Sequence, residues 1–133
     1  MKSSIRSFAV LAVAGLLLLT GGCNTVSVSS RQDLGVPTFA PTDPATVQIL
    51  RTPPMLPHIR LGEITCEPSG NPTVQAIEAK FQQAAAKMGA NAVVIVADQT
   101  QIMGAYVTGP WWGRSIQTYS GRVIVGVAIR YTQ

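Results

Sequence analysis

Residue types that usually carry out chemistry are scarce in this sequence of 133 residues. It holds one histidine, His58, and two cysteines, Cys23 and Cys66. A transition-metal site usually draws on several imidazole or thiolate ligands, so here it would need carboxylates brought together by folding. The sequence therefore predicts neither a metal site nor another cofactor.

Catalytic motifs are equally hard to find. Serines, His58 and Asp98 could form a triad, but no nucleophile-elbow motif surrounds any serine. Glu63 and Glu67 could form an acid–base pair in a cleft, although a strand carboxylate beside a turn carboxylate is far more often solvated. The glycines of residues 104–113 lack the helix and lysine that follow a phosphate-binding loop. We expect a protein that is not an enzyme.

The first 22 residues are organised like a lipoprotein signal peptide. Lys2 and Arg6 precede an apolar run at residues 8–19, and small residues then lead to Cys23. A helix of that run would rise about 18 Å, well short of the ~30 Å hydrocarbon core, so it is a poor permanent span. The string LLLLTGGC resembles a bacterial lipobox. The resemblance implies a lipid on the Cys23 sulfur, cleavage before Cys23 and acylation of the new amino group; a secreted soluble protein is the alternative.

The residue after the lipidated cysteine indicates which of the two bacterial membranes holds the lipid. Asn24 stands where enterobacterial lipoproteins retained in the inner membrane typically carry Asp. By that resemblance we expect the outer membrane, with the domain on its periplasmic face. Cys66 is then the single thiol of the mature domain, which excludes an intramolecular disulfide. We expect it to be buried as a small hydrophobe; pairing with another chain is the alternative.

The charge balance excludes one class of partner. Loss of the two signal-peptide cations lowers the formal charge from +4 to +2. The remaining positive residues are scattered singly, with no basic run to follow a phosphate backbone. We expect no nucleic-acid partner.

The composition changes near residue 46. Residues 23–45 comprise the lipidated cysteine and a segment with Ser, Thr and three prolines, which predicts a flexible linker. Residues 46–133 are expected to form one domain. Its apolar periodicity predicts the order β-β-α-β-β, an α+β fold with one helix packed on a four-stranded sheet. Gly62 marks a slip in strand alternation of the kind that a β-bulge makes. Asn71 can cap the helix, and Gly89 can end it.

The last strand, residues 122–131, has two different faces. One face carries large apolar residues: Val123, Val125, Val127, Ile129 and Tyr131. We expect this face to pack on the helix. The other face carries Ile124, Gly126 and Ala128. Either a second subunit covers it, which would make the protein a homo-oligomer, or it stays partly exposed.

Three segments carry a family resemblance. They are LGEIT at residues 61–65, AAAKMGANAVV at residues 84–94 and GVAI at residues 126–129. Together they resemble the YbjQ-like family and the related RcsF-like outer-membrane lipoproteins, which sense envelope stress. The resemblance covers residues 59–131 and implies the small α+β domain. With the lipobox, it also implies a role in envelope stress sensing, although RcsF-like domains hold two disulfides and this one has only Cys66.

A long segment between the last two strands, residues 101–121, is the most informative feature outside the core. Adjacent residues of an extended chain point to opposite sides, so we expect that Trp111 and Trp112 are not both buried. An exposed tryptophan beside Arg114 suits a protein partner, a glycan ring or a membrane interface.

The tyrosines of this segment allow two interpretations. Tyr106 and Tyr119 could join the same partner contact. They could instead hold the hairpin together, with Ile116, through cross-strand contacts.

These observations lead to one expected function. We expect an outer-membrane-anchored periplasmic lipoprotein that acts as a protein-interaction module, in envelope stress sensing or assembly. The predicted contact residues are Trp111, Trp112, Arg114, Tyr106 and Tyr119. The alternative is a lipoprotein that binds cell-wall glycan through the same aromatic residues.

Overall fold

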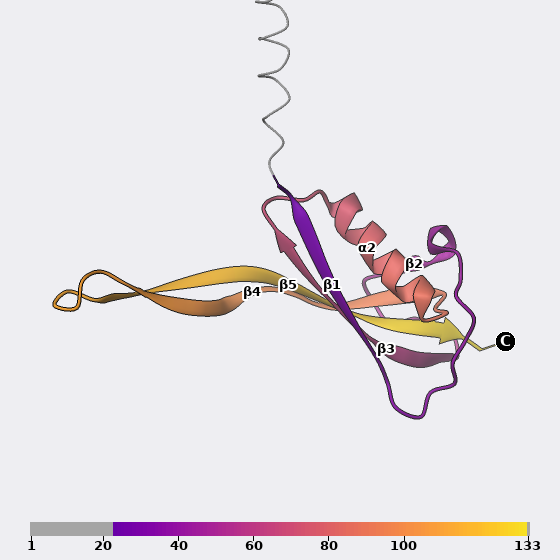
Figure 1. Ribbon diagram of the computed structural model, residues 1–133. Helices are drawn as coiled ribbons and strands as arrows, with labels where there is room; N and C mark the ends of the chain where they lie inside the picture. The colour runs from indigo at the N-terminus through magenta and orange to yellow at the C-terminus, as the bar shows by residue number, and fades with distance from the viewer. Residues whose placement is uncertain (1–22, 133) are drawn as a thin grey trace, which may run out of the picture.

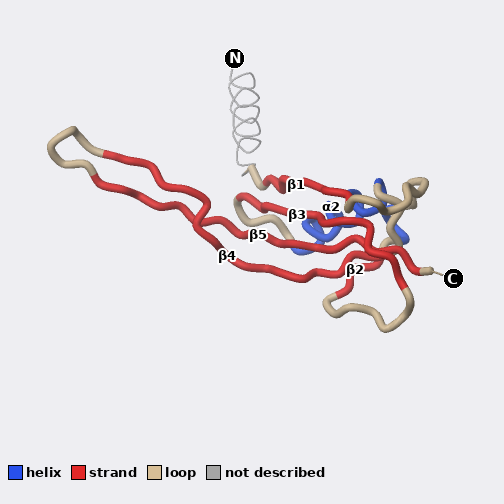
Figure 2. The backbone as a smooth tube through the Cα atoms, turned by 90° about the horizontal axis from the view of Figure 1, so that it is seen from below, coloured by secondary structure: helices blue, strands red, loops and turns tan. Residues whose placement is uncertain are grey.

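Figure 1 shows the computed structural model, which describes residues 23–132. The signal peptide expected at residues 1–22 lies outside the described residues. The elements in chain order are β1 (Thr25–Gln32), the 3-10 turn η1 (Pro44–Thr46), β2 (Gln48–Leu50), β3 (His58–Ser69), α2 (Val74–Lys87), β4 (Ala92–Thr108) and β5 (Ser115–Tyr131). The fold is α+β as predicted, with one α-helix lying on one face of the sheet (Figures 1 and 2).

The sheet has five strands rather than the four predicted. Their order is β1-β3-β5-β4-β2. β1 pairs with β3, β3 with β5 and β5 with β4 in antiparallel fashion, whereas β2 runs parallel to β4. The register shift between Arg60 and Gly62 is the bulge that the sequence indicates.

The additional strand comes from the segment that we expected to be a flexible linker. All eight residues of β1 pair with β3, from Thr25 opposite Ser69 to Gln32 opposite Gly62. Val26 and Val28 alternate with polar residues and pack against the core under α2. A polar segment can form an edge strand because only one of its faces is buried.

The chain after β1 is also held against the body. The Thr42 hydroxyl donates to the Ala90 carbonyl at 2.7 Å. The guanidinium of Arg130 lies 4.6 Å from the centre of the Phe39 ring, a cation–π distance. Residues 33–46 therefore cross the domain surface on their way to β2 and do not act as a free tether.

α2 begins and ends at short sequence signals. The Thr73 hydroxyl accepts from the Ala76 N–H at 3.2 Å, so Thr73 caps the helix two residues after the expected Asn71. Gly89 ends it with φ +76°, a conformation that side chains disfavour.

The helix covers the opposite face of β5 from the one predicted. Ile124 and Ala128 belong to the core under α2, with Phe81 and Ile64. A β-carbon on Gly126 would lie 2.9 Å from Phe81 Cε1, so the missing side chain makes room for that ring. The small residues face the helix because they let it approach the sheet closely, and they offer no surface to a second subunit.

The large residues of β5 lie on the other face. Ile129 is buried in a smaller cluster with Ala92 and Val94, and Val127 and Tyr131 pack against this cluster. The prediction that these β5 residues face the helix is therefore wrong.

β4 and β5 continue far beyond the body as a two-stranded hairpin (Figures 1 and 2). β5 pairs with β3 as far as Cys66 opposite Ile124, and β4 pairs with β2 only at residues 92–94. Beyond these points the two strands pair with each other, to Thr108 opposite Ser115. We call residues 101–121 the arm, residues 109–114 its tip and the paired remainder its shaft.

Candidate interaction arm

The tip is a tight turn that forces two tryptophans outward. The Gly113 N–H donates to the Pro110 carbonyl at 3.0 Å, which places Trp111 and Trp112 at the two corners of a four-residue turn. They are 78% and 74% exposed. Their rings lie edge to face, with centroids 5.5 Å apart and planes at 89°. Both predicted tryptophans are therefore exposed together, and Arg114 follows them, also exposed.

The two predicted tyrosines share one face of the shaft. Tyr106 pairs with Gln117 and Tyr119 with Gly104, and paired residues of an antiparallel ladder point to the same side. The Tyr119 side chain lies over Gly104, where a β-carbon would come within 3 Å of its hydroxyl oxygen and of two ring atoms. This cross-strand packing agrees with the second interpretation of the tyrosines. Both rings nevertheless remain about half exposed.

The other face of the shaft carries apolar residues that were not among the predicted contact residues. Val107 pairs with Ile116, and Ile102 lies further along the same face. All three are exposed. No regular alternation of apolar and polar residues marks this face, so the signal that could have found these residues is the scarcity of charge on both sides of the tip.

The arm is almost uncharged. Arg114 is the single charged residue among its 21 residues. At the usual share of about 25%, a segment of this length would carry about five. An exposed element that is rich in apolar side chains and poor in charge is typical of a surface that contacts something other than water.

The edges of the shaft are open to further pairing. Within residues 23–132, β4 and β5 have no other strand beside them along the arm. Each edge therefore presents backbone N–H and C=O groups that another chain can pair with. An isolated two-stranded hairpin is only marginally stable in water, which also favours a covering partner.

An ion pair joins the two strands where the arm meets the body. Arg122 donates to both carboxylate oxygens of Asp98, at 2.7 and 2.6 Å. These hydrogen bonds hold the pKa of the Asp98 carboxyl below its usual value and raise the pKa of Arg122. Asp98 lies opposite Ile124 and His58 lies opposite Tyr131, seven residues or about 23 Å further along β5, so the two side chains cannot belong to one triad.

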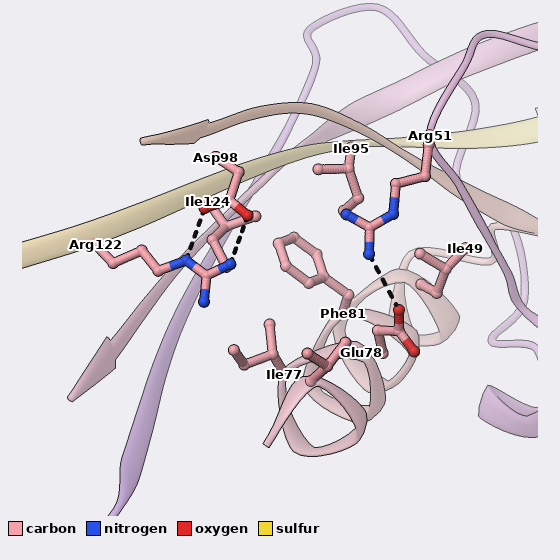
Figure 3. Close-up of a pocket in the computed structure, with 10 residues that line it drawn as sticks. Ile49, Arg51, Ile77, Glu78, Phe81, Ile95, Asp98, Arg122 and Ile124 are labelled. Carbon is pink, nitrogen blue, oxygen red and sulfur yellow. Dashed lines mark hydrogen bonds and ion pairs between the residues drawn. The ribbon is translucent and has the colours of Figure 1, made fainter. Parts of the chain in front are cut away.

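A narrow cleft lies beside this ion pair, between α2 and the sheet (Figure 3). Its apolar walls include Ile77, Phe81 and Ile124, and its rim carries the Arg122–Asp98 and Arg51–Glu78 pairs. The cleft holds only about 50 Å³. Small-molecule sites usually measure about 300–1,000 Å³, so this cleft is too small for an ordinary substrate.

The remaining candidates for chemistry lie apart. His58 is exposed, with Nδ1 2.7 Å from the Leu56 carbonyl oxygen. Glu63 and Glu67 lie four residues apart on β3, about 13 Å along the strand, too far to share a proton. In residues 23–132, no three His, Cys, Asp or Glu side chains gather in a way that could hold a metal ion.

The two cysteines lie in opposite environments. Cys66 is fully buried under α2, as predicted, and burial raises the pKa of its thiol. Cys23 is exposed, two residues before β1 begins. The helices formed within residues 23–132 are too short or too polar to cross a membrane.

Comparison with known proteins adds one similar structure. No protein-family model and no curated protein matches this chain. A crystal structure of the Francisella virulence factor FvfA is similar over 78% of this chain and 97% of that chain, with 12% identity and a TM-score of 0.48. The resemblance to the YbjQ-like and RcsF-like proteins stays a prediction.

Proposed function

We propose that this protein is a lipoprotein anchored in the outer membrane through Cys23, with its domain in the periplasm. We further propose that it is not an enzyme but a protein-interaction module for another envelope protein, in stress sensing or assembly. The arm is its contact element. It includes all the predicted contact residues: Tyr106, Trp111, Trp112, Arg114 and Tyr119.

The observation that carries this proposal is the combination of exposed apolar side chains and open strand edges on the arm. Val107 and Ile116 are 59% and 72% exposed on one face, and the two tyrosines lie on the other. A partner strand that pairs with either edge would gain backbone hydrogen bonds and cover these side chains at the same time. This mode of recognition adds a strand to an existing sheet.

Lipid anchoring is supported by the sequence around Cys23 and by the position of this residue. Its exposure at the start of the described chain leaves the sulfur and the amino group accessible to acylation. Several acyl chains on one residue hold a protein stably, whereas a single chain does not.

Crosslinking mass spectrometry in intact cells tests the proposal. The wild type is compared with Val107→Ser/Ile116→Ser, which removes apolar surface from the shaft. Leu34→Ser/Met55→Ser is the matched control, because both residues are fully exposed away from the arm. We expect one envelope protein to be captured by the wild type and the control but lost from the arm variant. Equal capture by all three would contradict the proposal.

Glycan binding is a second candidate, favoured by the exposed tryptophans. Aromatic rings present apolar faces on which sugar rings can stack. Because the two indole planes are nearly perpendicular, one sugar face can lie on only one of them. Co-sedimentation of the protein with purified cell-wall sacculi, lost on Trp111→Ala/Trp112→Ala, would favour this candidate over the first.

A further inference from the structure

We propose that the tip of the arm inserts into the interface of the lipid bilayer that holds the Cys23 acyl chains. The protein then touches its own membrane at two places. This inference rests on the lipid anchor of the proposed function. It assigns Trp111, Trp112 and Arg114 at the tip to the bilayer. The protein contact of the proposed function is thereby narrowed to the shaft, which carries Tyr106 and Tyr119.

The structure fixes where the anchor leaves the body. Cys23 precedes a strand whose eight residues are all paired with β3. The Asn71 N–H donates to the Asn24 side-chain oxygen at 3.0 Å. A β-carbon on Gly70 would lie 3.3 Å from the Cys23 carbonyl oxygen, so Cys23 lies against the turn after β3. With no free linker between lipid and domain, the bilayer lies beside this end of the sheet.

The arm leaves the body at the same end. A surface hollow there is lined both by residues of β1 and β3, including Ser27 and Ser69, and by residues of the arm, including Met103 and Tyr119. Figures 1 and 2 show the start of β1 and the arm on the same side of the body in both views. A membrane surface next to Cys23 can therefore meet the tip without the body lying between them.

The side chains of the tip match a bilayer interface. Tryptophan concentrates at the membrane–water boundary, where its ring lies among apolar groups and its N–H reaches polar ones. Arg114 adds a positive charge that anionic headgroups attract. The arm has no carboxylate that such headgroups would repel.

The open edges of the shaft limit how deep the contact goes. Unpaired backbone N–H and C=O groups cannot enter the hydrocarbon core without a large cost. At the tip, the Gly113 N–H is already bonded to Pro110, and the Thr108 and Ser115 hydroxyls lie 3.0 Å apart. The tip is thus better suited than the shaft to the interface, and shallow insertion is what the geometry favours.

Tryptophan fluorescence tests the inference directly, because Trp111 and Trp112 are the only tryptophans in the chain. The mature lipidated protein is reconstituted in vesicles of phosphatidylethanolamine and phosphatidylglycerol, with or without bromine on the acyl chains. We expect bromine near the headgroups to reduce the emission more strongly than bromine near the chain ends. We also expect vesicles to protect the emission from iodide in the aqueous phase.

A matched reporter separates contact at the tip from simple anchoring. Met55 is fully exposed in the loop before β3, at the end of that strand opposite to Ser69. Met55→Trp, in a background of Trp111→Phe/Trp112→Phe, places the reporter there on the same anchored domain. Its emission should remain quenched by iodide and insensitive to bromine.

Two results would overturn the inference. In one, brominated lipid quenches the tip tryptophans and the Met55→Trp reporter equally. In the other, iodide quenches the emission of the tip tryptophans fully even when vesicles are present. Neither result touches the proposed protein contact, which the shaft variant Val107→Ser/Ile116→Ser tests separately. Equal capture by the wild type, this shaft variant and the Leu34→Ser/Met55→Ser control, together with a lipid-protected tip, would conversely overturn the protein contact alone.

Discussion

Substitution of Gly126 tests which face of β5 the helix covers. In Gly126→Ala, the new β-carbon would lie 2.7 Å from Val93 Cγ1 and 2.9 Å from Phe81 Cε1. Both distances are too short, so the side chains of Val93 and Phe81, which are packed in the core, must move. Overpacking of this kind costs about 1–3 kcal/mol, whereas replacing a strand glycine at an open site gains about 0.5–1 kcal/mol. We therefore expect the free energy of unfolding to fall by about 1–2 kcal/mol.

Urea unfolding followed by far-UV circular dichroism measures this change, since the tryptophans of the arm do not report on the core. Gly113→Ala is the matched control, because nothing lies within 4 Å of its added β-carbon. It should change stability by no more than about 0.5 kcal/mol. In a Phe81→Leu background the cost of Gly126→Ala should shrink, with a coupling of about 0.5–3 kcal/mol. If Gly126→Ala is neutral or stabilising in the wild type, α2 does not pack on this face of β5.

Three further predictions concern Cys66, the Asp98–Arg122 pair and the arm as a whole. Cys66 should be alkylated only after unfolding, because it is buried and burial raises the pKa of its thiol. Mass spectrometry of native and urea-treated protein measures the extent of alkylation. Rapid alkylation of the native protein would contradict this prediction. Asp98→Asn should cost about 0.5–1 kcal/mol at neutral pH, because the pair is partly exposed. The pKa of Asp98 is lowered in the folded state, so this contribution is present above the unfolded-state pKa and is lost as the pH falls through the folded-state value. Urea midpoints of the wild type and the variant should converge in acid, and a gap that persists there would argue against the ion pair. Replacing residues 101–121 by an Asn-Gly turn should change the stability of the body by at most about 1 kcal/mol, because the arm packs mainly on itself; a collapse of the melting transition would show that the arm belongs to the core.

Local signals in the sequence predicted the helix and its neighbourhood well. Apolar residues at three- and four-residue spacing, ended by Gly89, correspond to α2. The slip at Gly62 corresponds to the bulge in β3. These features are predictable because a few adjacent residues determine them.

Features set by long-range packing were missed. β1 has only Val26 and Val28 as apolar residues, so its polar sequence looks like a linker until β3 lies beside it. The two faces of β5 were predicted the wrong way round, because its large apolar residues were expected to face the helix. Because α2 lies close to the sheet, the face of β5 with the small residues packs against it. The Phe81 ring fills the space above Gly126.

The site was predicted in part. The Pro110–Gly113 spacing places both tryptophans at the corners of a turn, so their exposure follows from local chemistry. The shaft was harder to predict, because strands exposed on both faces lack the alternation that a half-buried strand shows. Ile102, Val107 and Ile116 were therefore overlooked as contact residues.

Site-specific photocrosslinking in intact cells tests the central claim, that the arm is the contact element, most directly. A photoreactive amino acid is placed on the shaft at Val107 or Ile116, and at the exposed Leu34 on the body as a control. The account predicts a crosslink to one envelope protein from both shaft positions and none from position 34. Crosslinks that arise only from position 34, or none from either shaft position, would contradict it.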